Sequence, residues 1–393
     1  MLSANYKSPI ADRQSLPSPI DILSPALYRD QPNAVNIVKS TRQYETWLGS
    51  HTQLVKPDLR LKHQRMAEAP FPFLRATFYR WMQVWPQVCP DLNRVPKVLS
   101  VGDLHIENFG TWRDIEGRLV WGVNDFDEAA ELPFTIDLVR LAASALLAIE
   151  AGHLSVKTKD VCAVILDGYR QSLSERGHPF VLEEEHKWLR QIAFSELRDP
   201  VVFWEKMEKL PQMKEEIPAS AQDALEHLLP RHGLDYRVVR RVAGLGSLGR
   251  VRLVAIAECN GGKVAREAKA MVPSSVHWAQ AAQGPSELMY QAIINRAVRS
   301  PDPFVQLRGH WIVRRLSPHC SRIELNVLPR NRDELKLLFA MGWETANIHL
   351  GSRSALKPNR KYLDRLKPNW LSSAARDMAD AVTKDWRAWK KSM

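Results

Sequence analysis

The stretch GDLHIENFGTWRDIEGRLVWGVNDFDEAAELPFTIDLVR, residues 102–140, combines the polar pattern and the element pattern that decide the fold. The residues before it, 95–100, read VPKVLS and predict a strand that leads into a loop. Residues 111–123 predict a β-hairpin with its turn near Gly117, and residues 133–151 are apolar at helical spacing, which predicts a buried helix. The stretch therefore predicts a strand, a polar loop, a hairpin, a second polar loop and a helix.

Three side chains of the two polar loops fit the requirements of phosphoryl transfer. That reaction needs a carboxylate to orient or deprotonate a hydroxyl, and oxygen ligands that hold Mg²⁺ against the nucleotide phosphates. Asp103 follows the strand, Asn108 comes five residues later, and the hairpin then returns the chain to Asp125. Asp and Asn also form ordinary turns, but the joint pattern favours a catalytic base at Asp103 and metal ligands at Asn108 and Asp125.

Several segments resemble the bacterial domain-of-unknown-function family 2252, whose hallmark is GD-x-H-x-x-NF followed by NDFDE. They are GDLHIENF, VNDFDEA and PFTIDLVRLAAS, the upstream segment KHQRMAEAPFPFLRATF (residues 62–78), and the later EAKAMVPS. The resemblance covers most of residues 60–350. It implies a bacterial origin for the sequence pattern and leaves the activity open.

The same block also resembles the aminoglycoside and choline phosphotransferases, which have the protein-kinase-like fold. This resemblance implies ATP and Mg²⁺ as cofactors, with Asp103 as base and Asn108 and Asp125 as metal ligands. It further implies that Asp137 is buried and braces the catalytic loop through N–H groups near residues 104–106. Two residues give structural support: His105, which matches GD-x-H, and Asp127, which stands where D-F-G has glycine.

A glycine-rich segment, GLGSLGRV at residues 244–251, lies about 140 residues after Asp103. Gly244, Gly246 and Gly249 fit G-x-G-x-x-G, and Ser247 lies between them. A dinucleotide fold would need a helix directly afterwards, whereas the following residues alternate as a strand does. The segment favours a flap over nucleotide phosphates, although a plain glycine-rich hairpin has the same pattern.

A lysine and a glutamate downstream complete the expected nucleotide site. Lys269 lies on the next predicted strand and could neutralise the phosphates, while Lys263, beside a turn, is the alternative. Glu287 begins the predicted helix 286–298, with Ser286 as its N-cap, and could pair with Lys269.

The order of these motifs is reversed relative to a kinase-like fold, in which the glycine loop and lysine precede the catalytic loop. Either the chain is circularly permuted, or a degenerate small lobe lies in residues 30–75. We favour permutation, because residues 235–318 offer a small lobe and hinge in the correct internal order. The predicted class is thus a two-lobed, kinase-like α+β fold, with these parts: an extended arm (1–60), a helical catalytic lobe (61–232), a β-rich nucleotide lobe (233–318) and returning helices (319–393).

Composition limits the remaining possibilities. The 393 residues carry 55 Lys and Arg against 44 Asp and Glu, a net charge of +11, and residues 356–393 alone carry +6. That basic tail allows nucleic-acid binding, but residues 374–389 have the spacing of a docked helix. No apolar run is long enough for a membrane span, and four scattered cysteines fit free thiols in the cytoplasm.

The sequence therefore predicts transfer of a phosphoryl or, less favoured, a nucleotidyl group from Mg-ATP to a hydroxyl of an unidentified small molecule or protein. The alternative is an inactive nucleotide-binding protein of the same fold with a regulatory or interaction role.

Overall fold

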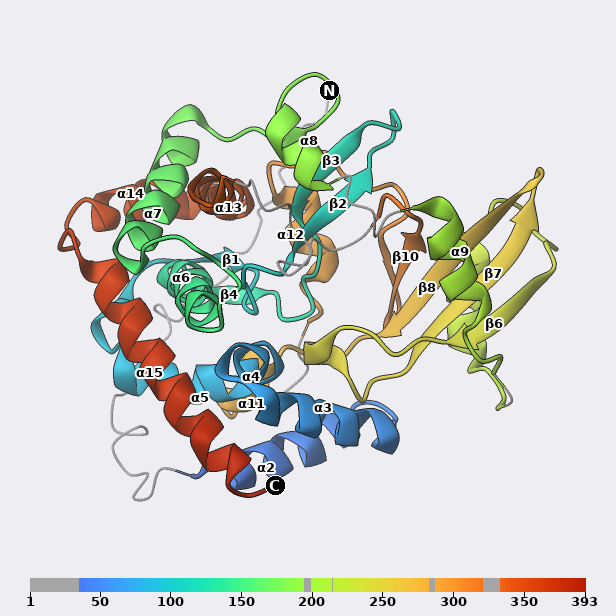
Figure 1. Cartoon of the computed structure of the whole chain (residues 1–393), viewed down its shortest axis with the longest axis horizontal. Helices are drawn as coiled ribbons and strands as arrows, with labels where there is room; N and C mark the ends of the chain where they lie inside the picture. The colour runs from blue at the N-terminus through green and yellow to red at the C-terminus, as the bar shows by residue number, and fades with distance from the viewer. Residues whose placement is uncertain (1–34, 194–198, 214, 283–286, 321–332) are drawn as a thin grey trace, which may run out of the picture. The chain divides into compact units, whose positions relative to one another are not determined.

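The computed structural model describes residues 35–193, 199–213, 215–282, 287–320 and 333–393. The chain divides into Met1–Asn36, of which only the last two residues are described, and the unit Ile37–Met393. This second unit is a mixture of α-helices and small β-sheets (Figure 1). Among the described residues, none of its helices combines the length and the hydrophobicity that crossing a bilayer requires.

The first half of the unit alternates helices with short strands. Its helices are α2 (Ile37–Gly49), α3 (Lys56–Glu68), α4 (Pro70–Ala76), α5 (Phe78–Val88), η1 (Asp91–Arg94), α6 (Thr135–Glu150), α7 (Thr158–Glu175) and α8 (Lys187–Ala193). Its strands are β1 (Lys97–Ser100), β2 (Phe109–Arg113), β3 (Leu119–Val123), β4 (Ala130–Pro133) and β5 (Phe180–Val181). β1 pairs with β4, and β2, β3 and β5 form a second sheet.

The second half contains the largest sheet and the closing helices. Its strands are β6 (Tyr236–Arg240), β7 (Arg252–Cys259), β8 (Gly262–Ala270), β9 (Gln306–Arg308) and β10 (Trp311–Leu316). Its helices are α9 (Pro200–Glu208), α10 (Ala219–His227), η3 (Leu245–Ser247), α11 (Ser275–Ala279), α12 (Tyr290–Arg296), α13 (Glu334–His349), η5 (Arg353–Ala355), α14 (Leu356–Leu363) and α15 (Trp370–Lys390).

The five-stranded sheet has the order β6-β7-β8-β10-β9 and is antiparallel throughout. Successive residues of its strands face opposite sides, as strand geometry requires: Leu253 packs in the cluster that contains α10, and Val254 packs in the cluster that contains Met207 of α9. One helix therefore covers each face of the sheet.

Helix α6 is the centre of the helical region. Nearly all of its side chains are buried, and α7, α13 and α15 pack around it (Figure 1). Helices α7 and α13 approach closely because each has a glycine at the crossing: a Cβ on Gly168 or on Gly342 would lie 2.0 Å from a carbonyl oxygen of the other helix. Helix α15 packs its apolar face on α6 and α3–α5, so the basic C-terminal segment is a docked helix.

Most predicted elements occur near their predicted positions, including the 111–123 hairpin, the buried helix and the strands around the glycine-rich segment. Two differ. Residues 37–60, expected as part of an extended arm, form α2 and the start of α3, because the Pro- and Ser-rich stretch of the arm ends at residue 25 and the single proline of residues 37–60, Pro57, lies in the first turn of α3, where proline is tolerated. The helix expected from Ser286 begins at Tyr290, and Ser286 lies outside the described residues.

Candidate functional site

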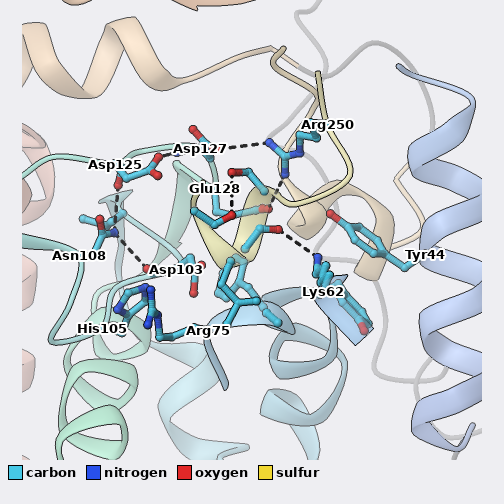
Figure 2. A pocket seen from close by; sticks show the side chains of 18 residues that line it. Tyr44, Lys62, Arg75, Asp103, His105, Asn108, Asp125, Asp127, Glu128 and Arg250 are labelled. Atoms are coloured by element: carbon cyan, nitrogen blue, oxygen red, sulfur yellow. Dashed lines mark hydrogen bonds and ion pairs between the residues drawn. The ribbon is translucent and has the colours of Figure 1, made fainter. Parts of the chain in front are cut away.

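A single pocket gathers residues from both halves of the sequence. The loops of residues 101–108 and 125–128 form one side, the glycine-rich segment forms another, and helices α2–α5 close it (Figure 2). Among the residues that line it are Asp103, His105, Asn108, Asp125, Asp127, Gly244, Gly246 and Ser247, all singled out in the sequence. The fold therefore brings the loops of Asp103 and Asp125 and the glycine-rich segment together, although they lie more than 100 residues apart in the sequence.

Asp137 holds the first loop by its backbone. Its two carboxylate oxygens accept hydrogen bonds from the N–H groups of Val101 (2.8 Å) and Gly102 (2.9 Å), and His349 of α13 lies 3.1 Å away. The side chain is fully buried, as expected, but its partners lie just before Asp103 and not near residues 104–106, where Ser144 bonds Ile106 N instead. The helix thus fixes the point at which β1 ends.

Asp103 presents one oxygen to the protein and one to the pocket. Arg140, from α6, donates to its Oδ1 through Nε (3.0 Å) and through a second, shorter bond. No described residue donates a hydrogen bond to Oδ2, and Gly246 lies so near that a Cβ there would be 3.3 Å from that oxygen. Burial raises the pKa of Asp103 in spite of Arg140. A carboxylate with one free oxygen and a raised pKa is suited to accept a proton.

Asn108 connects the loop of residues 101–108 to the loop of residues 125–128, which we call the acidic loops. Its amide nitrogen donates to the backbone carbonyls of Asp103 (3.2 Å) and Asp125 (3.0 Å). The hairpin of β2 and β3 makes this possible, because Phe109 pairs with Val123 at its open end. The amide nitrogen is thus used by the two carbonyls. The side-chain oxygen of Asn108 accepts no hydrogen bond from the described residues and is available to a ligand.

Lys269 joins the sheet to the second acidic loop. From β8 its ammonium lies 3.2 Å from Asp125 Oδ1 and also contacts Asp127. Burial alone would raise the pKa of Asp125, but Lys269 and the nearby arginines hold it well below its usual range. Burial and the charge of Asp125 raise the pKa of Asp127. Asp125 is therefore the member of this pair that loses its proton more readily.

The other lysine and the glutamate expected at this site lie elsewhere. Lys263 is half exposed at the far end of β8 and pairs with Glu208. Glu287 is exposed and precedes α12, while Lys269 is buried and bonded to the two aspartates. The expected Glu287–Lys269 pair is not among the ion pairs of the described residues.

The glycine-rich segment links β6 to β7 and bends inward. Gly244 and Gly249 have positive φ angles (74° and 99°), which favour glycine. Gly246 approaches both Asp103 and helix α4 closely, because a Cβ there would lie 3.3 Å from Asp103 Oδ2 and 3.1 Å from the carbonyl oxygen of Arg75. The hydroxyl of Ser247 accepts a hydrogen bond from Arg252 (2.8 Å) and so faces the sheet.

Several pocket residues had no role in the sequence-based prediction. They are Tyr44, Lys62, Arg75, Tyr79, Glu128 and Arg250. Lys62 and Arg75 lie in residues 62–78, the segment that resembles the bacterial family, and this resemblance is the sequence signal that points to them. Glu128 binds Ser274 and Ser275 by hydrogen bonds of 2.7–2.9 Å and ties the acidic loop to α11.

The oxygen ligands suit Mg²⁺ in kind. A carboxylate and an amide oxygen are ligands that Mg²⁺ accepts, and it ordinarily completes its shell with water and phosphate oxygens. Asp125 and Asn108 supply one of each, on neighbouring loops of the same pocket. In the described part of the chain no three His, Cys, Asp or Glu side chains are grouped as a metal site, so these two residues would hold the ion only together with a bound phosphate.

Comparison with known proteins gives one match. The curated proteins and the solved structures yield no significant similarity. Residues 54–203 match the family model described as an uncharacterized protein conserved in bacteria (DUF2252), a stretch that contains both acidic loops and the helix that carries Asp137.

Proposed function

We propose that the protein is a kinase-like phosphotransferase that moves the terminal phosphoryl group of Mg-ATP to a hydroxyl group. The observation that carries this proposal is the free Oδ2 of Asp103, beside Asn108 and Asp125 and beneath the glycine-rich segment. General-base, metal-ligating and phosphate-covering groups converge there from sequence positions 140 residues apart, as phosphoryl transfer requires.

Each residue of the site has a separate role in the proposed reaction. Asp103 Oδ2 accepts the proton of the acceptor hydroxyl while the oxygen of that hydroxyl bonds to the γ-phosphorus. The bond from the γ-phosphorus to the bridging oxygen breaks, and ADP leaves. Arg140 keeps the other oxygen of Asp103 in place. Asp125 and Asn108 would hold Mg²⁺, which neutralises phosphate charge when bound. Lys269 would exchange part of its bonding with Asp125 and Asp127 for the nucleotide phosphates.

The five-stranded sheet supports a permuted kinase-like arrangement within this proposal. It supplies the glycine-rich segment between β6 and β7 and the lysine on β8. The chain then passes through β10 to α13, whose His349 contacts Asp137. In this interpretation the nucleotide lobe follows the catalytic loops in the sequence and lies beside them in the fold.

A regulatory nucleotide-binding protein is the second candidate, and one observation favours it. Gly246 lies against Asp103, and Lys269 is bonded to Asp125 and Asp127. The glycine-rich segment and the lysine therefore already contact the groups that would meet a nucleotide, which we call the closed arrangement of the site. A protein that binds a nucleotide without turnover could keep this closed arrangement. The two candidates differ in the need for Asp103.

Two isosteric variants separate the candidates. Calorimetric titration with Mg-ATP, and ADP formation in the presence of hydroxyl compounds from a bacterial extract, are measured for wild type, Asp103→Asn and Asp125→Asn. We expect Asp103→Asn to lower turnover about 100-fold or more with nearly unchanged Mg-ATP affinity, and Asp125→Asn to weaken Mg-ATP binding but not Mg²⁺-free ATP binding.

The outcomes are distinct. Wild-type protein that binds no Mg-ATP at millimolar concentration contradicts both candidates. Full turnover in Asp103→Asn contradicts the assignment of the base. Tight Mg-ATP binding without turnover in any condition favours the regulatory protein. Circular dichroism of each variant checks the fold, because Asp103→Asn also leaves Arg140 without its carboxylate partner.

A further inference from the structure

Lys62 is a buried cation in the lining of the pocket. It lies on α3 with only 4% of its surface exposed, and its ammonium donates a hydrogen bond to the carbonyl of Gly246 (3.0 Å). Figure 2 shows it across the pocket from Asn108 and Asp125, with its nitrogen directed inward. The side chain therefore reaches the tip of the glycine-rich segment.

Among the described residues, the other buried or half-buried cations at or next to the pocket have carboxylate partners. These pairs are Arg75–Glu107, Arg140–Asp103, Arg250 with Asp127 and Glu128, and Lys269 with Asp125 and Asp127. Lys62 has no ion pair among the described residues, although Glu45 and Glu128 influence it from a distance. Buried charges are ordinarily paired, because an unpaired one loses its hydration without compensation. The missing counter-charge indicates that an anion enters the pocket.

Further donors flank the same space. The Nε atoms of Arg75 and of Arg250 are buried and have no hydrogen-bond partner in the part of the chain that the structure describes. Burial lowers the pKa of Lys62 to about 8, and an anion bound beside the ammonium would raise that pKa again. Lys62 thus stands among unused donors that suit oxygen atoms of a phosphate.

A purely structural role is the competing interpretation. Lys62 would then serve only to hold the glycine-rich segment down through Gly246. That role uses one of the three ammonium N–H groups and could be filled by a neutral donor such as glutamine. The two interpretations differ in whether the positive charge itself is needed.

We propose that Lys62 binds phosphoryl oxygens of a ligand in this pocket, an inference that rests on the proposed function for the identity of that ligand. The ammonium of Lys62 bonds Gly246, the residue that also lies against Asp103 Oδ2, so a phosphate bound in the pocket beside Asp103 would come near this ammonium. The phosphate has two possible sources, the terminal phosphate of ATP or a phosphate group carried by the acceptor.

The test compares Lys62→Gln with Lys56→Met, a control at an exposed lysine of the same helix. Calorimetric titrations use inorganic phosphate, pyrophosphate, Mg-ATP and Mg-ADP. A hydrogen bond to a charged group is stronger than one between neutral groups, so we expect Lys62→Gln to weaken pyrophosphate binding about tenfold or more and Lys56→Met to leave it unchanged. Thermal unfolding verifies that both variants fold.

The pattern of losses identifies the source. Loss for Mg-ATP but not Mg-ADP assigns Lys62 to the terminal phosphate. Unchanged nucleotide binding, with loss of phosphate binding to the ADP-loaded protein, assigns it to a phosphorylated acceptor. If no probe is affected, or if wild type binds neither phosphate nor pyrophosphate, Lys62 is a structural clamp and the proposal is wrong. If pyrophosphate binding depends on Lys62 but the protein does not bind ATP, the phosphate-binding role of Lys62 stands and the proposed function is contradicted.

Discussion

The two halves of the candidate site are held in opposite ways. The acidic loops are anchored from the protein interior: Asp137 bonds the backbone before Asp103, and Asn108 bonds the backbone of both loops. The glycine-rich segment, residues 244–251, depends on contacts with its neighbours, among them the hydrogen bond from Lys62 to the carbonyl of Gly246 and the backbone bond from Val55 N–H to Gly249.

This difference matches two physical requirements of a reaction site. Reacting groups must hold their geometry within fractions of an ångström, which buried and fully satisfied hydrogen bonds provide. A cover over a ligand must move when the ligand enters and leaves. Experiments on each half can therefore test whether the acidic loops are rigid and whether the glycine-rich segment is an adaptable cover of the site.

The largest effect is expected at Asp137. Asp137→Asn keeps the shape but removes the charge and presents an NH₂ group to donors at Val101, Gly102 or His349. Because the site is fully buried, we expect the free energy of unfolding to fall by about 3 kcal/mol. Urea denaturation measures this change.

A matched control is Asp364→Asn, at an exposed position after α14. Surface substitutions of this kind usually change stability by about 0.5 kcal/mol or less. An equal, small effect of the two variants would contradict the description of the acidic loops as internally anchored.

The anchored half is also the half that the sequence predicts best. The meeting of Asn108 with the loop of Asp125 follows from local spacing, because the intervening residues form one hairpin whose register places Phe109 opposite Val123. Even there the sequence misplaced the partners of Asp137 by a few residues, because a buried carboxylate bonds whichever N–H groups packing brings to it.

The adaptable half depends on contacts between distant segments, which spacing does not encode. Lys62 meets Gly246 across 184 residues, and Arg75 reaches the pocket only because α4 packs against the glycine-rich segment. No periodicity predicts such a contact. The resemblance of residues 62–78 to a family segment marked the region without assigning its side chains a role.

A second prediction concerns the pH dependence of stability at Lys62. Its pKa in the folded protein, about 8, is below the ordinary value of 10.5. Between these pH values the unfolded chain binds the proton and the folded protein does not, so wild type becomes more stable relative to Lys62→Met as pH rises. We expect the difference to change by about 1 kcal/mol between pH 8.5 and 9.5.

Urea titrations of both proteins at each pH measure the difference, which removes the contributions of other titrating groups. The charged groups that influence Lys62 are Glu45, Glu128, Asp103 and Arg250, and both proteins share them. A difference that is constant from pH 7.5 to 10 would mean that Lys62 has an ordinary pKa and a counter-charge within the protein.

The smallest effect, and the one that best separates the two halves, is expected from adding a single methyl group to the cover. In Gly246→Ala the new Cβ would lie 3.1 Å from the carbonyl oxygen of Arg75 and 3.3 Å from Asp103 Oδ2, so the segment must shift by a few tenths of an ångström. Gly262→Ala is the control, since a Cβ there meets nothing within 4 Å and the residue needs no positive φ. We expect Gly262→Ala to stabilise the protein by about 0.5 kcal/mol through the unfolded chain, and Gly246→Ala to destabilise it by about 1 kcal/mol or less. If Gly246→Ala costs several kcal/mol, the glycine-rich segment is as rigid as the acidic loops; if it stabilises the protein as the control does, the segment already stands clear of Asp103, and the closed arrangement of the site is not its stable state in solution.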